Sequence, residues 1–158
     1  MKLRRLSLAD WPLIKSIYEE GLATGMATFE TEAPPSWEAW DRKYLTPCRW
    51  GIAEDGLLRA WIALTPFSKR LVYRGVAEIS VYVGKQSRGK GYGKALMQQV
   101  IQEAPGQGFW TLQSAIFAQN EASIQLHKQL GFREVGVRER IAQRDGQWHD
   151  NVLLEKRF

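Results

Sequence analysis

The chain has 158 residues and a formal net charge of +5, with 44% hydrophobic and 25% charged residues. These proportions are typical of a globular protein, and the length predicts one domain over residues 1–158. The positive charge favours acidic partners such as phosphates, nucleotides or nucleic acids. Cys48 is the only cysteine, which excludes an intrachain disulfide and favours a reducing compartment.

Several classes of protein are disfavoured by what the sequence lacks. The N-terminal segment has no apolar run of signal-peptide length and no stretch could span a membrane, so we expect a cytoplasmic protein without a membrane partner. With two histidines and one cysteine, the chain lacks the usual ligands of a metal site, and we expect no metal. It has neither a zinc pattern nor a basic tract interleaved with aromatics, so no nucleic-acid partner is expected.

The N-terminal half predicts a strand, two helices and a hairpin. Ser7 and Asp10 form an S-x-x-D start signal, and Pro12 suits the first turn of a helix. Apolar residues then recur at helical spacing up to Gly21, and the polar segment that follows predicts a loop. The expected elements are a strand at 2–7, a helix at 12–21, a loop at 23–36, a helix at 36–45, and strands at 49–55 and 57–67 around Asp55-Gly56.

The C-terminal half predicts a buried strand followed by alternating helices and strands. The run "VAEISVYV" at 76–83 is the clearest strand because it is short, apolar and β-branched. The next helix places Leu96, Val100 and Ala104 on one face. The expected elements are this strand, helices at 93–104 and 120–131, and strands at 109–117, 132–143 and 148–158. Together the two halves predict a mixed α/β sheet.

A basic, glycine-rich loop links the strand at 76–83 to the following helix. Four cations occur within ten residues, and no Asp or Glu lies between Glu78 and Glu103. At such a junction the glycines let the backbone approach a ligand closely, and the first N–H groups of the helix attract an anion. The loop therefore predicts a phosphate-binding site in surroundings free of acidic residues.

Three patterns of phosphate-binding loop are candidates for this segment. The pattern G-x-x-x-x-G-K-[ST] fits from Gly84 but needs a hydroxyl where the chain has Gly91. The dinucleotide pattern G-x-G-x-x-G/A fails from both glycines at which it could begin. The pattern [RQ]-x-x-G-x-[GA] fits "RGKGYG", with Arg88, Gly91 and Gly93 at its fixed positions.

A second motif, "NEASIQLHKQLGF" at residues 120–132, accompanies this loop. With "RGKGYGKAL" it resembles the GNAT superfamily of acetyl-CoA-dependent N-acetyltransferases, and the order of elements is similar as well. Within that superfamily the chain resembles the phosphinothricin and methionine-sulfoximine acetyltransferases, through "TFETE", "AEISVYV", "NEASIQLH" and "GQWHD". The resemblance covers nearly the whole chain. It implies an α/β (α+β) GNAT fold, with a mixed, mostly antiparallel sheet of about seven strands flanked by about four helices.

The resemblance implies that the anion is the pyrophosphate of acetyl-CoA. In such folds the strand before the loop pairs its backbone with the pantetheine arm, and the helix that Asn120 opens lies near the thioester. The implied cofactor-binding residues are Val81, Tyr82, Val83, Arg88, Gly89, Lys90, Gly91, Tyr92, Gly93, Lys94, Asn120 and Ser123.

Acetyl transfer to an amine needs a base, donors for the oxyanion and a proton for the departing thiolate. The related enzymes have Glu at the position of Glu78, so we expect it to be the base, directly or through a water, or to bind the substrate ammonium. His127 stands where many GNAT enzymes have Tyr, and imidazole can protonate a thiolate near neutral pH. A packed, inert histidine is the other interpretation, with Tyr82 and Tyr92 as alternative donors. A backbone N–H near Val81 is the expected oxyanion donor.

The acceptor pocket is predicted mainly from the resemblance, which places substrate contacts just before and within the strand at 76–83. Arg70 is a candidate to bind an amino-acid carboxylate bidentately, and Phe29 to form a pocket wall. Trp148, His149 and Asp150 complete the site, line a dimer interface or serve only as part of the sheet. The implied substrate-binding residues are Phe29, Ser68, Lys69, Arg70, Glu78, Ile79 and Ser80.

The function implied is acetyl transfer from acetyl-CoA to the α-amine of a small amino acid or analogue, directly within a ternary complex. Phosphinothricin, methionine sulfoximine and methionine sulfone are the implied acceptors, and a homodimer is expected. The alternative is a GNAT enzyme for a polyamine, an antibiotic or a protein N-terminus. A non-catalytic acyl-CoA sensor and a basic nucleic-acid-binding module are further alternatives, the latter disfavoured because the cations cluster in a loop that the motifs already explain.

Overall fold

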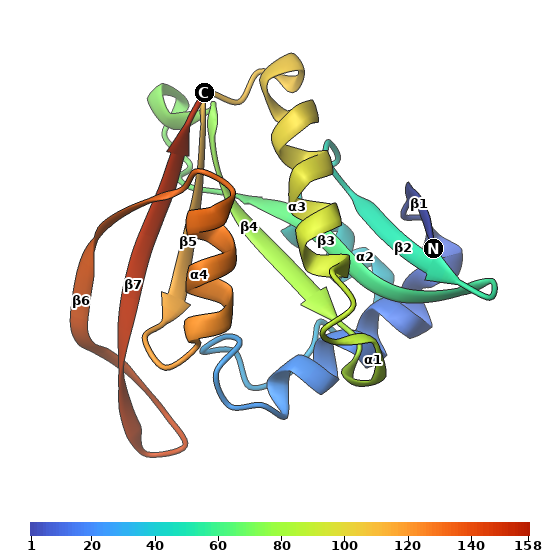
Figure 1. Cartoon of the computed structure of the whole chain (residues 1–158), viewed down its shortest axis with the longest axis horizontal. Coiled ribbons are helices and arrows are strands. Elements are labelled where there is room, and N and C mark those ends of the chain that lie inside the picture. The colour runs from blue at the N-terminus through green and yellow to red at the C-terminus, as the bar shows by residue number, and fades with distance from the viewer.

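A seven-stranded sheet runs through the molecule in the order β1-β2-β3-β4-β5-β7-β6. The structure is a computed structural model that describes residues 1–158, and Figure 1 shows its elements. Every neighbouring pair is antiparallel except β4 and β5, which are parallel. The strands are β1 (Lys2–Arg5), β2 (Trp50–Glu54), β3 (Leu57–Pro66), β4 (Val76–Val83), β5 (Thr111–Phe117), β6 (Arg133–Arg144) and β7 (Gln147–Arg157). The α-helices are α1 (Trp11–Leu22), α2 (Trp37–Lys43), α3 (Tyr92–Glu103) and α4 (Glu121–Gln129).

The predicted order of strands and helices is confirmed. The strand predicted at 76–83 is β4, with the same bounds. The start signal before α1 is formed as expected, because the Ser7 backbone N–H donates to Asp10 Oδ2 at 2.9 Å. The predicted end of this helix at Gly21 is one residue short of its observed end. Gly21 serves packing instead, since a Cβ there would lie 2.7 Å from the Tyr82 ring.

Two tight turns close the hairpins that the sequence predicted. Asp55 and Gly56, between β2 and β3, have φ angles of 54° and 76°, and Asp145 and Gly146, between β6 and β7, have 52° and 77°. Positive φ at both central residues defines the hairpin turn that Asp-Gly favours. The two Asp-Gly pairs therefore form the turns of both predicted hairpins.

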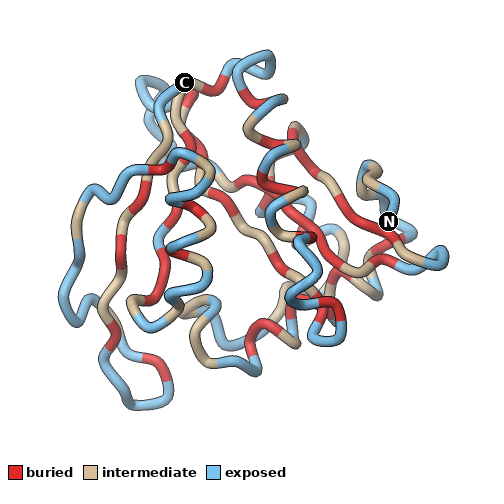
Figure 2. Tube along the Cα trace, in the orientation of Figure 1, coloured by how far each residue is buried: buried red, intermediate tan, exposed pale blue.

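The two faces of the sheet carry separate hydrophobic cores. In Figure 1, α3 and α4 lie on one face and α1 and α2 on the other, and Figure 2 shows the buried residues along the sheet between them. On the α3 face Ile79 packs in the same cluster as Leu96. On the α1 face Tyr82 packs with Trp61 and Trp40. Alternate residues of β4 thus point into opposite cores, as the strand period requires.

The central strands β4 and β5 separate partway along their length. They pair only from Val76 to Glu78, opposite Thr111 to Gln113. Beyond Glu78 they diverge, which is visible in Figure 1, while β4 stays paired with β3 on its other edge. Alternate backbone groups of β4 beyond Glu78 therefore lack a strand partner on the β5 side, and this opening holds the candidate site.

The single cysteine lies in the core of the protein. Cys48 is fully buried, and burial raises the pKa of its thiol to about 12. Because the thiolate is the reactive form, Cys48 is a packing residue rather than a nucleophile.

No helix is long and apolar enough to cross a membrane. No three His, Cys, Asp or Glu side chains lie together in a group that could hold a metal ion.

Candidate active site

A cavity of about 370 Å³ lies where β4 and β5 separate. Its volume is in the range of small-molecule sites. Side chains from β4, β5, the start of α4 and the loop after α1 line it, so it is reached from both faces of the sheet. Of the residues predicted from the sequence, the lining includes Phe29, Glu78, Ile79, Ser80, Val81, Tyr82, Asn120, Ser123 and His127.

About half of the residues that line the cavity were not predicted from the sequence. Gln113 is the last residue of β5 that pairs with β4, so the β5 residues after it border the opening. Only the strand pairing, and not a local sequence pattern, marks these residues. No sequence signal points to Lys43, which reaches the cavity from the last turn of α2. The missed lining residues are Met26, Ala27, Thr28, Glu30, Lys43, Thr65, Ser114, Ala115, Ile116, Phe117 and Asn151.

Glu78 has the electrostatic setting of a general base. It is half-buried in β4 and lines the cavity. Burial raises the pKa of Glu78 above its ordinary value, against the opposing effects of a Gln113 hydrogen bond and of the positive charges of Arg138 and Lys43. A carboxylate whose pKa is raised toward neutrality accepts a proton more readily while it remains available as a base. The geometry is thus consistent with the role predicted for Glu78.

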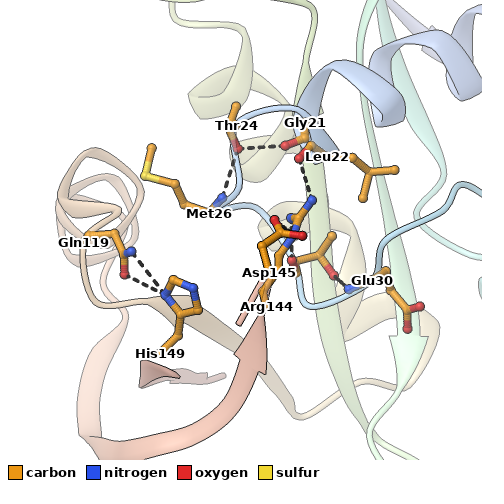
Figure 3. A network of polar contacts seen from close by, with 10 residues as sticks. Gly21, Leu22, Thr24, Met26, Glu30, Gln119, Arg144, Asp145 and His149 are labelled. Carbon is orange, nitrogen blue, oxygen red and sulfur yellow. Dashed lines mark hydrogen bonds and ion pairs between the residues drawn. The ribbon is translucent and has the colours of Figure 1, made fainter. Parts of the chain in front are cut away.

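The loop after α1 is anchored to the sheet by a buried arginine. Arg144, at the end of β6, donates from Nη2 to the Leu22 carbonyl at 2.7 Å and from Nη1 to the Thr28 carbonyl at 2.9 Å. Figure 3 shows its side chain reaching this loop beside Glu30 and Met26. These two bonds hold the first part of the loop, from Leu22 to Thr28, against the end of β6, and so fix part of the wall that the loop contributes to the cavity.

An aromatic group stiffens the same wall. Phe29, predicted to line the pocket, packs on Phe117 with ring centroids 4.5 Å apart. His149 stacks on Phe117 at 4.6 Å and meets Phe29 edge-on at 6.1 Å. It is also linked to Gln119, 3.2 Å from its Nδ1, as Figure 3 shows. His149 therefore packs against the two lining rings without lining the cavity itself. Its neighbour Trp148 is 51% exposed.

His127 is engaged at both ring nitrogens. Its Nδ1 lies 2.7 Å from the carbonyl oxygen of Ser123, and its Nε2 lies 2.8 Å from Ser114 Oγ. Burial lowers the pKa of His127 below its ordinary value, although the bond to Ser123 acts in the opposite direction. A carbonyl oxygen only accepts, so the single proton of the neutral ring is on Nδ1. The Nε2 atom therefore has a lone pair, which accepts a hydrogen bond from Ser114.

The glycine loop has the backbone that an anion site requires. Gly89 and Gly91 have φ angles of 79° and 82°, and Gly91 caps α3, whose first N–H groups have no acceptor within the helix. The expectation of acid-free surroundings was wrong. Glu54 accepts a hydrogen bond from Tyr92 Oη at 2.8 Å, and the Glu20 carboxylate accepts one from the Lys85 N–H. Both acids are distant in sequence and reach the loop only through the fold.

The segment predicted to bind an acceptor carboxylate lies away from the cavity. Ser68, Lys69 and Arg70 follow β3 and are not among the lining residues. The Arg70 guanidinium lies 5.6 Å from the centre of the Tyr73 ring. These three residues do not line the cavity of the single chain, and their contact with a substrate stays a prediction.

Lys43 is the one lysine or arginine that lines the cavity. Its ammonium lies 5.4 Å from the centre of the Tyr44 ring and 5.7 Å from that of Tyr18. Lys43 is an exposed residue, and cation–π contacts at exposed sites contribute about 0.5 to 1 kcal/mol each, which favours this position of the ammonium. The cavity therefore contains a positioned positive charge as well as the carboxylate of Glu78.

Residues 11–132 match the model of the Acetyltransferase (GNAT) family. This span exceeds half of the chain, so the protein belongs to that family, as the motifs predicted. The chain is an acetyl-CoA-dependent N-acetyltransferase, and acetyl-CoA is its co-substrate.

Three known proteins illustrate the similarity. The chain is 32% identical to an L-methionine sulfoximine/L-methionine sulfone acetyltransferase of Pseudomonas aeruginosa, over 97% of this chain and 92% of the relative. A GNAT superfamily phosphinothricin acetyltransferase from Sinorhizobium meliloti, solved with acetyl-CoA, superposes with a TM-score of 0.90 at 29% identity, over 99% of this chain and 87% of that one. A ribosomal-protein-alanine N-acetyltransferase from Brucella melitensis gives a TM-score of 0.92 at 26% identity, over all of both chains.

Proposed function

We propose that this protein transfers the acetyl group of acetyl-CoA to the α-amine of a small amino acid or amino-acid analogue. Phosphinothricin, methionine sulfoximine and methionine sulfone are the candidate acceptors, because relatives named for these compounds align with nearly the whole chain. The observation that carries the proposal is a cavity in which the Glu78 carboxylate and the Lys43 ammonium line the same space.

The two charges suit the two ends of an α-amino acid. Glu78, with its raised pKa, takes a proton from the α-ammonium or binds it. Lys43 pairs with the α-carboxylate as a point charge, which is the role that the sequence suggested for Arg70. A polyamine has no carboxylate for Lys43 and is disfavoured by the positive charge in the wall.

We propose direct transfer in a ternary complex, since the cavity is lined from both faces of the sheet. The glycine loop and α4 lie on one face, where the thioester of acetyl-CoA would enter between β4 and β5. Glu78 and Phe29 lie on the other side of the opening, where the amine would approach. Holding both reactants at one gap replaces a bimolecular encounter with a positioned attack.

A protein N-terminus is the second candidate acceptor. The similarity to a ribosomal-protein-alanine N-acetyltransferase supports it, and an N-terminal amine is also an α-amine. Such an acceptor has no free α-carboxylate, so Lys43 would contribute little to its binding. Acetylation of a short alanine-headed peptide in preference to any free amino acid would favour this candidate.

We also propose a cytoplasmic homodimer of single-domain subunits. The edge strand β6 exposes Val135, Val137 and Ile141 to 47%, 50% and 49%, beside Trp148 on β7. An unpaired edge with apolar side chains suits docking of a second copy. Light scattering of the purified protein should give twice the chain mass, and a monomer at micromolar concentration would contradict the dimer.

The substrate is tested by following thiol release from acetyl-CoA across a panel of amines. The panel contains phosphinothricin, methionine sulfoximine, methionine sulfone, the standard amino acids, spermidine, an aminoglycoside and an alanine-headed peptide. We expect the fastest release with one of the first three. Fast release with spermidine or the aminoglycoside alone would contradict the proposed acceptor class while leaving the use of acetyl-CoA intact. Double-reciprocal plots that intersect indicate a ternary complex, whereas parallel plots contradict it.

A further inference from the structure

The side chains of Ser114 and His127 form a hydrogen bond with each other at the wall of the cavity. Ser114 is 3% exposed and His127 is 2% exposed, and both residues line the cavity. We propose that the Ser114 hydroxyl carries the proton from the amine nitrogen to the departing sulfur, with His127 behind it as the group that holds the proton during transfer. This inference rests on the proposed acetyl transfer and adds a catalytic residue to it.

The position of Ser114 in β5 places its hydroxyl on the cofactor side of the opening. Gln113 is the last β5 residue to pair with β4, and it lies opposite Glu78. The next side chain, that of Ser114, points to the other face of the sheet because strand side chains alternate. On that face Leu126 of α4 lies 3.7 Å from where a Cβ of Gly93 in the glycine loop would be. Ser114 and α4 therefore lie on the side from which the thioester arrives, and Glu78 on the side of the amine.

The hydrogen bonds set the direction in which a proton can first move. Because the Ser123 carbonyl engages Nδ1 of His127 at 2.7 Å, the vacant nitrogen is Nε2. That atom lies 2.8 Å from Ser114 Oγ. The neutral ring is therefore ready to receive a proton through Ser114, and it has none of its own to give at Nε2. The Ser123 carbonyl then stabilises the charged ring, as the carboxylate orienting group does in Ser–His pairs.

The step balances without any further reactant. Glu78 first removes one proton from the substrate ammonium. The amine nitrogen then bonds to the thioester carbon, whose carbonyl electrons move to oxygen. As the surplus proton leaves nitrogen for Ser114 Oγ, the hydroxyl proton of Ser114 moves to His127 Nε2. The carbonyl re-forms, and the C–S bond breaks with its electron pair on sulfur. The proton on Ser114 Oγ passes to sulfur, which becomes a thiol, and the proton on His127 Nε2 returns to Ser114 Oγ. Glu78 releases its proton to solvent. Ser114 and His127 end unchanged, and the products are an amide and free CoA.

Kinetic analysis of variants tests this shuttle, once the wild type has been shown to acetylate an amine of the panel. Ser114→Ala should lower kcat with acetyl-CoA about 100-fold, within the usual contribution of positioned proton transfer. Ser114→Thr keeps the hydroxyl and should restore most of the rate. His127→Gln retains an amide able to bond Ser114 but cannot hold a proton. It should lose as much activity as Ser114→Ala, and the double variant should lose no more than either single one.

The choice of leaving group separates the shuttle from a packing role. The thiolate of S-(4-nitrophenyl) thioacetate is a far weaker base than that of CoA and departs without a proton. With this donor, Ser114→Ala should match the wild type. An equal loss with both donors, or additive losses in the double variant, would show a structural role and overturn the proposal. A stable acetyl-Ser114 detected by mass spectrometry after mixing with acetyl-CoA alone would overturn it as well.

Nuclear magnetic resonance tests the starting state independently of turnover. The chain has only two histidines, so His149→Gln leaves the ring nitrogens of His127 as the one imidazole signal. We expect a neutral ring with its proton on Nδ1, and a proton on Nε2 would overturn the proposal. A wild type that acetylates no amine contradicts the proposed function. An active wild type with a fully active Ser114→Ala contradicts only the shuttle.

Discussion

Replacing Glu78 with glutamine removes a charge from the cavity with almost no change in shape. Glu78 is half-buried, and burial raises its pKa, so its ionised form is disfavoured in the folded protein relative to water. A glutamine of the same size can still form a hydrogen bond with Gln113. We therefore expect Glu78→Gln to fold normally, with a melting temperature equal to or slightly above that of the wild type.

The expected loss of activity follows from the role of a base. General base catalysis contributes roughly 10²- to 10⁴-fold, which corresponds to about 3 to 5 kcal/mol of activation free energy. Glu78→Gln should thus lower kcat/KM for the acceptor by that factor while calorimetry shows unchanged binding of acetyl-CoA. The matched control is Glu30→Gln, because Glu30 lines the same cavity but is exposed and lies outside β4. Its turnover should stay within a small factor of the wild type.

The pH dependence of kcat/KM is a second test of the role of Glu78. A base works in its ionised form, so kcat/KM of the wild type should fall as the pH drops through the raised pKa of Glu78. Glu78→Gln should lack this acid limb. Near-normal turnover in Glu78→Gln, or an acid limb that survives the substitution, would refute the assignment of Glu78 as the base.

Further predictions concern the cofactor loop, the acceptor pocket and the N-terminal ion pair. Gly91→Val forces a β-branched residue to a φ of 82°, so acetyl-CoA binding measured by calorimetry should be lost in a folded protein. Lys43→Met should raise KM for an amino-acid acceptor more than it lowers kcat, whereas Arg70→Ala should do so only if Arg70 reaches the cavity from a second copy. Equal kinetics of Lys43→Met and the wild type would contradict the carboxylate contact. Burial opposes ionisation of Asp10, but its hydrogen bonds from Arg4 and Ser7 lower the pKa overall. Asp10→Ala should therefore reduce the free energy of unfolding by about 1 kcal/mol at neutral pH, and this difference should vanish as the pH falls through the lowered pKa.

The features that the sequence predicted are those encoded by residues close together in the chain. The alternation and β-branching of residues 76–83 predict β4 with its observed bounds. Asp-Gly pairs mark the two hairpin turns because few other residues adopt positive φ at both positions. The glycine loop likewise depends on a continuous segment, so its backbone conformation at Gly89 and Gly91 follows from local pattern.

The features that the sequence did not predict depend on contacts between distant segments. Lys43 enters the cavity because α2 packs against the α1 face of the sheet, and nothing near it in the chain marks that position. Ser114 lines the cavity because the β4–β5 pairing stops at Gln113, and no local sequence pattern marks that point. Glu20 and Glu54 reach the glycine loop from α1 and β2. Arg70 looked well placed before β4 in the sequence, yet it lies outside the cavity wall.

The central claim is that the acceptor is an α-amino acid whose amine meets Glu78 while its carboxylate meets Lys43. The most direct measurement compares kcat/KM for methionine sulfone with that for the amine that lacks its carboxyl group and is otherwise identical. Thiol release from acetyl-CoA reports both rates. The account predicts that removal of the carboxylate lowers kcat/KM at least about 10-fold, the loss expected for one charge-assisted contact. Equal or faster turnover of the carboxylate-free amine would contradict it.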